Sequence, residues 1–197
     1  MTSSSTAPKI DEALISAALK KGLADAMIDP AQKHALFLRG FSTVIESVIQ
    51  EPYRLEQKNA TDTERLYDIC VFELAAVVET GWKLEKPVME VRSLVAAIEI
   101  ENRQGPRYTY EDLWKVIFAR ADYRVFCGGI KSGGYGNGSG DSKVLMKERL
   151  KAIQSYYGPG NTNGLIVGFY PHPDEWTAGK NLAEEVCVTS LPQELLP

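Results

Sequence analysis

Two glutamates, Glu99 and Glu101, stand two positions apart at the end of the apolar segment LVAAIEIE, residues 94–101. Because side chains alternate along a strand, both carboxylates point to the same face. The residues before them are apolar on both faces, which is typical of a strand covered on both sides. Burying two carboxylates costs several kcal/mol unless a cation or hydrogen bonds compensate. A divalent metal is one compensation, and a strand end that reaches solvent is the alternative.

A third acid, Asp68, stands inside the apolar segment LYDICVF, residues 66–72. Alternation places its side chain on the same face as Cys70 and Phe72. An acidic residue between apolar neighbours also needs a partner. The pattern therefore indicates a carboxylate site at the ends of two neighbouring strands.

The elements that must position these acids follow from the spacing of the apolar residues. Helical spacing recurs before a polar link at residues 56–65, and β-branched and aromatic residues dominate the segments after it. Thr109 and Asp112 have the spacing of a capping box, and Thr80-Gly81 offers a turn. Helices are predicted over 10–27, 31–50, 109–121 and 142–158, and strands over 66–78, 88–100, 122–130, 164–170 and 183–191. This order predicts an α/β (α+β) fold, a central mixed sheet flanked by helices.

The chain of 197 residues fits a single domain over 10–197, preceded by a disordered tail over 1–9. Its 44% hydrophobic and 24% charged residues are ordinary for a globular protein. A formal net charge of −4 argues against a protein that coats nucleic acid through bulk positive charge. No apolar run approaches the length of a membrane span and no signal-peptide layout opens the chain, so we expect a cytoplasmic location.

Cysteine and histidine offer little metal chemistry. Cys70, Cys127 and Cys187 are isolated, without the spacing of paired ligands, and are interpreted as reduced core residues. The two histidines, His34 and His172, have no partner at metal-ligand spacing, so a zinc site or a histidine-based triad is poorly supported.

Three motifs follow one another along the chain. A strand contains the aspartate Asp68, the next long strand ends with the acid-x-acid pair Glu99 and Glu101, and a helix with Asp112 and Lys115 precedes a short strand. This arrangement resembles the PD-(D/E)xK restriction-endonuclease-like superfamily. The resemblance covers about residues 31–127, which would form its α-β-β-β-α-β core, with Glu46 in the first helix. Residues 128–197 would be a C-terminal α-β-β extension.

The resemblance implies an activity and a site. In that superfamily the strand aspartate and the first acid of the pair hold a divalent metal, and the lysine of the pair positions or activates the attacking water. Asp68 and Glu99 would therefore bind Mg²⁺, or Mn²⁺, with help from the backbone carbonyl of Ile100. Magnesium suits such oxygen ligands and keeps waters that can act as nucleophile. The reaction implied is phosphodiester hydrolysis.

The sequence departs from the motif at the lysine position, which is Glu101. Some members of the superfamily have an acid there and others carry the lysine on the following helix, so Glu101 and Lys115 are the candidate catalytic residues. The helical wheel places Lys115 well away from the apolar stripe of its helix, and Glu46 lies opposite the stripe of its own. A solvated surface lysine is therefore the alternative for Lys115.

Basic residues near the acids suggest the partner. Arg103, Arg107 and Lys131 are the candidate substrate-binding residues, and the expected partner is nucleic acid, DNA in preference to RNA, with no membrane. A homodimer is left open. The glycine-rich segment 128–140 lacks a Walker motif and is interpreted as a mobile loop more readily than as a nucleotide site.

A second class of function is carried alongside the nuclease. The replaced lysine and the acidic overall charge favour a catalytically inactive nuclease-fold protein that binds or regulates, in a defence, plasmid or phage context.

Overall fold

The computed structural model describes residues 7–58, 67–77, 88–101, 106–131, 151–152, 155, 164–177 and 181–191. Within these residues the elements follow one another in the order helix, helix, three strands, helix, three strands. Two short 3₁₀ helices lie between the last two strands. The elements are α1 (Glu12–Ala26), α2 (Lys33–Glu46), β1 (Tyr53–Gln57), β2 (Ile69–Val77), β3 (Val88–Glu101), α3 (Pro106–Ile117), β4 (Tyr123–Ile130), β5 (Leu165–Pro171), η1 (Pro173–Glu175), η2 (Leu182–Glu185) and β6 (Cys187–Leu191).

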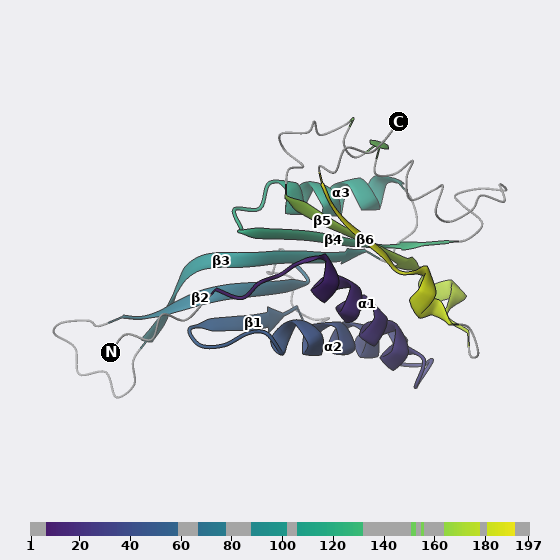
Figure 1. Ribbon diagram of the computed structural model, residues 1–197, viewed down its shortest axis with the longest axis horizontal. Coiled ribbons are helices and arrows are strands. Elements are labelled where there is room, and N and C mark those ends of the chain that lie inside the picture. Colours follow the sequence, from purple (N-terminus) through teal and green to yellow (C-terminus); the bar gives the residue numbers. More distant parts are fainter. Residues whose placement is uncertain are drawn as a thin grey trace.

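The strands form one six-stranded sheet in the order β1-β2-β3-β4-β5-β6. Strands β1, β2 and β3 are antiparallel neighbours, β3, β4 and β5 run parallel, and β6 is antiparallel to β5. Helices α1 and α2 cover one face of the sheet and α3 covers the other (Figure 1). The predicted mixed α/β fold is confirmed.

The core on the α1 and α2 face is built from the apolar stripes of these two helices and one face of the central strands. Asp11 caps the N-terminus of α1, since its side chain accepts a hydrogen bond from the Leu14 N–H at 3.0 Å. Gly22 lets the two helices approach, because a Cβ there would lie 2.8 Å from the Phe37 carbonyl oxygen. Phe37 and Ile98 are fully buried in this layer.

The α3 face has its own, smaller core. Leu113 and Val116 of α3 are fully buried against Ala97 of β3, Phe126 of β4 and Val167 of β5. Strand β3 is therefore covered on both faces, which accounts for its nearly continuous apolar run. Its far end is different, since β2 and β3 extend together beyond the layers of helices (Figure 1).

Several local predictions are corrected. The third strand implied by the α-β-β-β-α-β core was not located in the sequence; it is β1, whose end lies in the polar segment interpreted as a link. Helix α3 begins at Pro106, so Thr109 is its fourth residue and the predicted capping box is wrong. The predicted turn at 80–81 and most of the predicted helix over 142–158 lie outside the described residues, as does the glycine-rich segment beyond Lys131.

The cysteine prediction holds for two residues of three. Cys70 and Cys127 are buried, whereas Cys187 is exposed at the start of β6, so its assignment to the core was wrong. Among the helices in the described ranges, none has the length and apolar character needed to cross a membrane.

Candidate active site

The ends of β2 and β3 bring Asp68 and Glu99 together. Ile69 pairs with Ile98 in the antiparallel register, so the residue before Ile69 lies beside the residue after Ile98. The Asp68 Oδ2 atom accepts a hydrogen bond from the Ile100 N–H at 2.8 Å. The Asp68 N–H in turn donates to Glu99 Oε2 at 3.3 Å. The two acids predicted to bind metal therefore meet across the strand pair.

Lys115 reaches the same point from α3. Its Nζ donates to Glu99 Oε1 at 3.0 Å and also to the carboxylate of Asp112. The Tyr67 hydroxyl donates to the Lys115 carbonyl oxygen at 3.3 Å, which ties the helix to the start of β2. Lys115 is thus an ion-paired residue of the site, and the surface-lysine alternative does not describe it.

Burial decides the charge states of these groups. Burial, followed by the nearby charge of Asp68, raises the pKa of Glu99 to about 8. Burial also raises the pKa of Asp68, although the hydrogen bond from the Ile100 N–H opposes the shift. For Lys115, burial alone would lower the pKa, but the bonds to Asp112 and Glu99 raise it above its usual value. The lysine is therefore a permanent cation near neutral pH, whereas the buried Glu99 carboxyl favours its protonated form there while no metal is bound.

Asp112 is the residue of this site that sequence reasoning missed. Its side chain is only 5% exposed and forms an ion pair with Lys115. From the sequence, Asp112 is a capping residue and, with Lys115, part of the helix motif of the resemblance, but it has no assigned role in the site. The signal for such a role is its position three residues before Lys115, because residues at that spacing are neighbours on a helix surface.

The other predicted residues lie in different places. Glu101 is buried at the end of β3, on the same face as Glu99, and pairs in register with Gly128 of β4. Glu46 is exposed at the last residue of α2. Lys131 follows β4 and forms an ion pair with Asp174, apart from the acids.

The two predicted arginines cannot be placed as side chains. Arg103 lies outside the described residues, and of Arg107 only its helical backbone in the first turn of α3 is described.

The chemistry of the donor set suits a hard divalent cation. Across the described ranges, no group of three or more His, Cys, Asp or Glu side chains is arranged to hold a metal ion. Mg²⁺, however, is usually bound through one or two carboxylates together with waters and substrate phosphates. Asp68, Glu99 and the carbonyl of Ile100 supply oxygen donors only, and burial, the largest cause of the raised pKa values of both acids, disfavours their charged forms, a cost that a bound cation would offset. The residues therefore fit Mg²⁺ or Mn²⁺.

The large cavity that the structure shows lies elsewhere. It has a volume of about 960 Å³ and opens between the start of α1, the start of β4 and the strand β6, with Asp122 and Cys187 in its wall. None of the predicted site residues lines this cavity.

The fold and the site define an α/β protein with a carboxylate–lysine centre at the end of a mixed sheet. Comparisons with protein-family models, with curated proteins and with solved structures gave no match. The function is therefore argued from the geometry of the site itself.

Proposed function

We propose that this protein hydrolyses phosphodiester bonds of nucleic acid, DNA in preference to RNA, with Mg²⁺ or Mn²⁺ held by Asp68 and Glu99. The observation that carries the proposal is the 3.0 Å contact between Lys115 Nζ and Glu99 Oε1, which supplies a lysine from α3 where the strand motif has Glu101. The order α2-β1-β2-β3-α3-β4 supports it, since it is the α-β-β-β-α-β order of the restriction-endonuclease-like core.

The reaction needs a nucleophile, a proton acceptor and stabilisation of charge. Water attacks phosphorus, the bond from phosphorus to the leaving oxygen breaks, and the products are a phosphate monoester and a hydroxyl group. A bound divalent metal supplies polarisation of the phosphoryl oxygens and a lower pKa for its water. Because the pKa of Lys115 is raised, this residue acts as a cation and hydrogen-bond donor toward the phosphate and not as the base.

Glu101 is the proposed acceptor of the water's proton. It is buried on the same strand face as Glu99, two residues further along β3. Lys115 is already protonated, and Asp68 and Glu99 are assigned to the metal. Glu101, at the lysine position of the motif, thus has the role of a base, and Lys115 of α3 supplies the positive charge instead.

The test is cleavage of single-stranded DNA, double-stranded DNA and RNA by the purified chain with Mg²⁺ or Mn²⁺. We expect Asp68→Asn and Glu99→Gln each to reduce cleavage at least about 100-fold, because each removes one of two metal-binding carboxylates. Glu90→Gln is the matched control, since Glu90 is an exposed glutamate at the other end of β3. Cleavage that persists in both site variants would come from a contaminant or another site and would overturn the assignment.

A second candidate is a non-catalytic binding or regulatory protein of the same architecture. It is favoured by one observation, the pairing of Lys115 with two carboxylates, which offsets the positive charge that a phosphate would meet. Calorimetric titration with Mg²⁺ and Mn²⁺ separates the two. Metal binding that Asp68→Asn abolishes supports the nuclease, whereas a folded protein that binds neither metal and cleaves nothing supports the second candidate.

A further inference from the structure

A cluster of basic residues lies beyond the ends of β4 and β5. Lys131 directly follows β4, His172 directly follows β5, and the two strand ends are joined by the His172 N–H donating to the Ile130 carbonyl oxygen at 2.9 Å. Lys33, the first residue of α2, reaches the same turn and donates from Nζ to the Pro173 carbonyl oxygen at 2.9 Å. Three elements far apart in the sequence therefore place basic side chains around η1.

One carboxylate occupies the middle of this cluster. Asp174 Oδ2 lies 2.7 Å from Lys131 Nζ, and the Asp174 backbone N–H donates to His172 Nδ1 at 3.1 Å. The hydrogen bond from Lys131 holds the pKa of Asp174 below its ordinary value, and the charge of Lys33 acts in the same direction. The cluster thus stabilises an anion, although Asp174 itself is 57% exposed and could be displaced by a competing one.

The turn that carries the cluster is held firmly by aromatic packing. The Trp176 indole N–H donates to the Pro171 carbonyl oxygen at 2.7 Å, and its ring stacks on Phe37 with a centroid distance of 5.2 Å. His172 is itself buried, with 6% of its surface exposed. The only other histidine, His34, has its ring 6.0 Å from that of Trp176. The turn that carries Asp174 is therefore held in place beside Lys131 and Lys33, and a preorganised site lowers the entropic cost of binding an anion.

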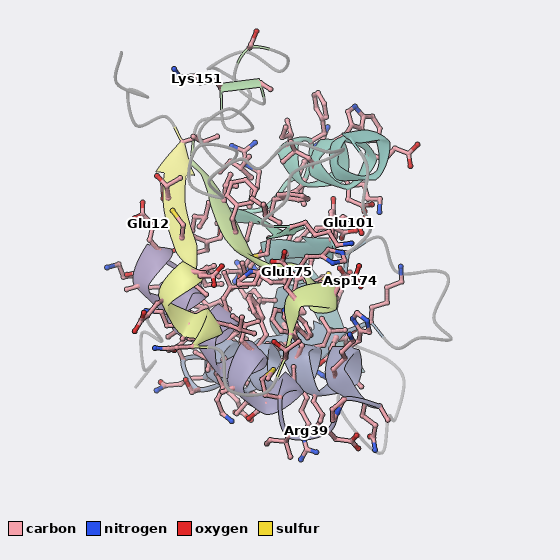
Figure 2. The ribbon with its side chains drawn as sticks, turned by 90° about the vertical axis from the view of Figure 1, so that its right-hand side faces the viewer. Glu12, Arg39, Glu101, Lys151, Asp174 and Glu175 are labelled. Atoms are coloured by element: carbon pink, nitrogen blue, oxygen red, sulfur yellow. The ribbon has the colours of Figure 1, made fainter. Side chains whose placement is uncertain are left out.

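The cluster faces the same end of the sheet as the candidate active site. Strands β3, β4 and β5 are parallel, and Glu101 pairs with Gly128, which in turn pairs with Phe169. Lys131 and His172 each lie three residues beyond those positions, about 10 Å along the strand direction. Figure 2 views the molecule from this end, with Glu101, Asp174 and Glu175 labelled.

We propose that Lys33 and Lys131 form a phosphate-binding subsite, in which the Asp174 carboxylate, on a turn positioned by His172, holds the place of the phosphate while no ligand is bound. Lysine ammonium groups are ordinary phosphate donors, and a carboxylate presents the same kind of acceptor oxygens. The subsite rests on the proposed function, because it would hold a phosphate of the same nucleic acid strand that is cleaved at Asp68 and Glu99. The ligand chemistry is a phosphate group, either a diester within the strand or a monoester at its end.

The experiment measures fluorescence anisotropy of labelled DNA, single- and double-stranded, against the full chain in EDTA, where metal-dependent cleavage cannot occur. We expect Lys131→Met and Lys33→Met each to weaken binding about tenfold, the value of one charge-assisted contact. Asp174→Asn should tighten binding by a similar factor, because the internal competitor is removed. Lys20→Met, on the exposed face of α1, is the matched control for the lysines and should leave affinity unchanged.

The control for Asp174 is its neighbour, because removing any negative charge favours nucleic acid in a general way. Glu175→Gln makes the same change of charge one residue further along η1. The subsite would be overturned if Asp174→Asn and Glu175→Gln changed the DNA affinity equally. It would also be overturned if Lys33→Met and Lys131→Met bound DNA as tightly as Lys20→Met. Comparing DNA with and without a terminal phosphate shows which kind of phosphate binds. If the affinity depends on the terminal phosphate, the ligand is the monoester at the chain end; if the affinity is the same for both, the ligand is a diester within the strand.

Binding and cleavage fail in distinguishable ways. Tight binding that depends on Lys131, with no cleavage under Mg²⁺ or Mn²⁺, would leave the subsite standing and remove the nuclease proposal. Cleavage that depends on Asp68, together with a DNA affinity that substitutions at Lys33, Lys131 and Asp174 do not change, would support the nuclease proposal and overturn the subsite.

Discussion

The two ends of β3 carry the same kinds of charged residue in opposite surroundings. At the outer end, Glu73 of β2 meets Arg92 of β3, whose side chain is 70% exposed, at 3.4 Å. At the inner end, Glu99 meets Lys115 at 3.0 Å with only 7% of its side chain exposed. Water screens the first pair, whereas the second has lost most of its hydration and depends on its neighbours.

The difference teaches where chemistry can arise on this sheet. An ion pair in solvent leaves both groups near their ordinary behaviour and constrains little. A buried cluster with more acids than cations has shifted pKa values and an affinity for a further cation. Each end of β3 can be perturbed separately, and the following predictions do so in order of expected effect.

The largest effect is expected for the apolar side of the inner end. Ile98 is fully buried on the α1 and α2 face, directly beside Glu99 in the chain. Ile98→Ala should lower the free energy of unfolding by about 2–5 kcal/mol, through lost burial and a cavity. Val91→Ala at the outer end, where Val91 is 54% exposed, should change it by less than about 0.5 kcal/mol. Urea denaturation measures both, and similar losses would show that the two ends are equally buried.

The next effect concerns the pH dependence of stability without metal. The folded-state pKa of Glu99 is raised by burial to about 8 from the ordinary 4.5, so the folded protein holds a proton that the unfolded chain has released. Its stabilising contribution is complete below about pH 4.5 and is lost as the pH rises to about 8, at up to about 1.4 kcal/mol per pH unit. Glu99→Gln removes this titration and should flatten the decline.

Urea denaturation between pH 5 and 9 in EDTA checks this prediction. Glu90→Gln, which changes an exposed glutamate at the outer end, should keep the wild-type slope. If the Glu99 and Glu90 variants gave parallel curves, Glu99 would have no raised pKa in the folded state.

These two predictions involve the features that sequence periodicity could anticipate. Alternation along β3 placed Glu99 and Glu101 on one face, opposite Ile98, and alternation along β2 placed Asp68 with Cys70. Both strands were predicted, so the convergence of Asp68 and Glu99 required only that the strands be neighbours. Strand β1 was missed because its sequence YRLEQ carries three polar residues and gives little apolar contrast.

The residues that periodicity could not place are those whose contacts depend on reach or on distant chain segments. A helical wheel follows the direction of Cβ and places Lys115 well away from the apolar stripe, but the four-carbon stem of this lysine carries its ammonium group to Glu99. Lys33 and Pro173 are 140 residues apart in the sequence, so no local pattern relates them. Tertiary packing alone brings such groups together.

A smaller effect is expected from removing the cation of the inner end. Lys115→Met keeps the aliphatic stem but leaves Glu99 and Asp112 without their shared ammonium group. Breaking a fully buried pair costs about 3–5 kcal/mol, and because the Lys115 side chain is 27% exposed we expect about 2 kcal/mol near pH 8. Urea denaturation measures the loss, with Lys20→Met as the control on an exposed helix face. A loss no greater than that of the control would mean that water already stabilises these carboxylates.

The smallest effect is expected at the outer end, where the exposed ion pair can be removed at little cost. Arg92→Ala should lower the free energy of unfolding by less than about 0.5 kcal/mol, because water replaces the arginine around Glu73 and the Ser93 hydroxyl still donates to that carboxylate at 3.1 Å. The loss should shrink further in high salt, which screens exposed charges, whereas the loss caused by Lys115→Met should persist. Urea denaturation at low and high salt gives both comparisons. A loss above about 1 kcal/mol for Arg92→Ala that does not change with salt would show that the outer end is shielded from solvent. In that case a difference in burial would not explain why Glu99 and Glu73 behave differently.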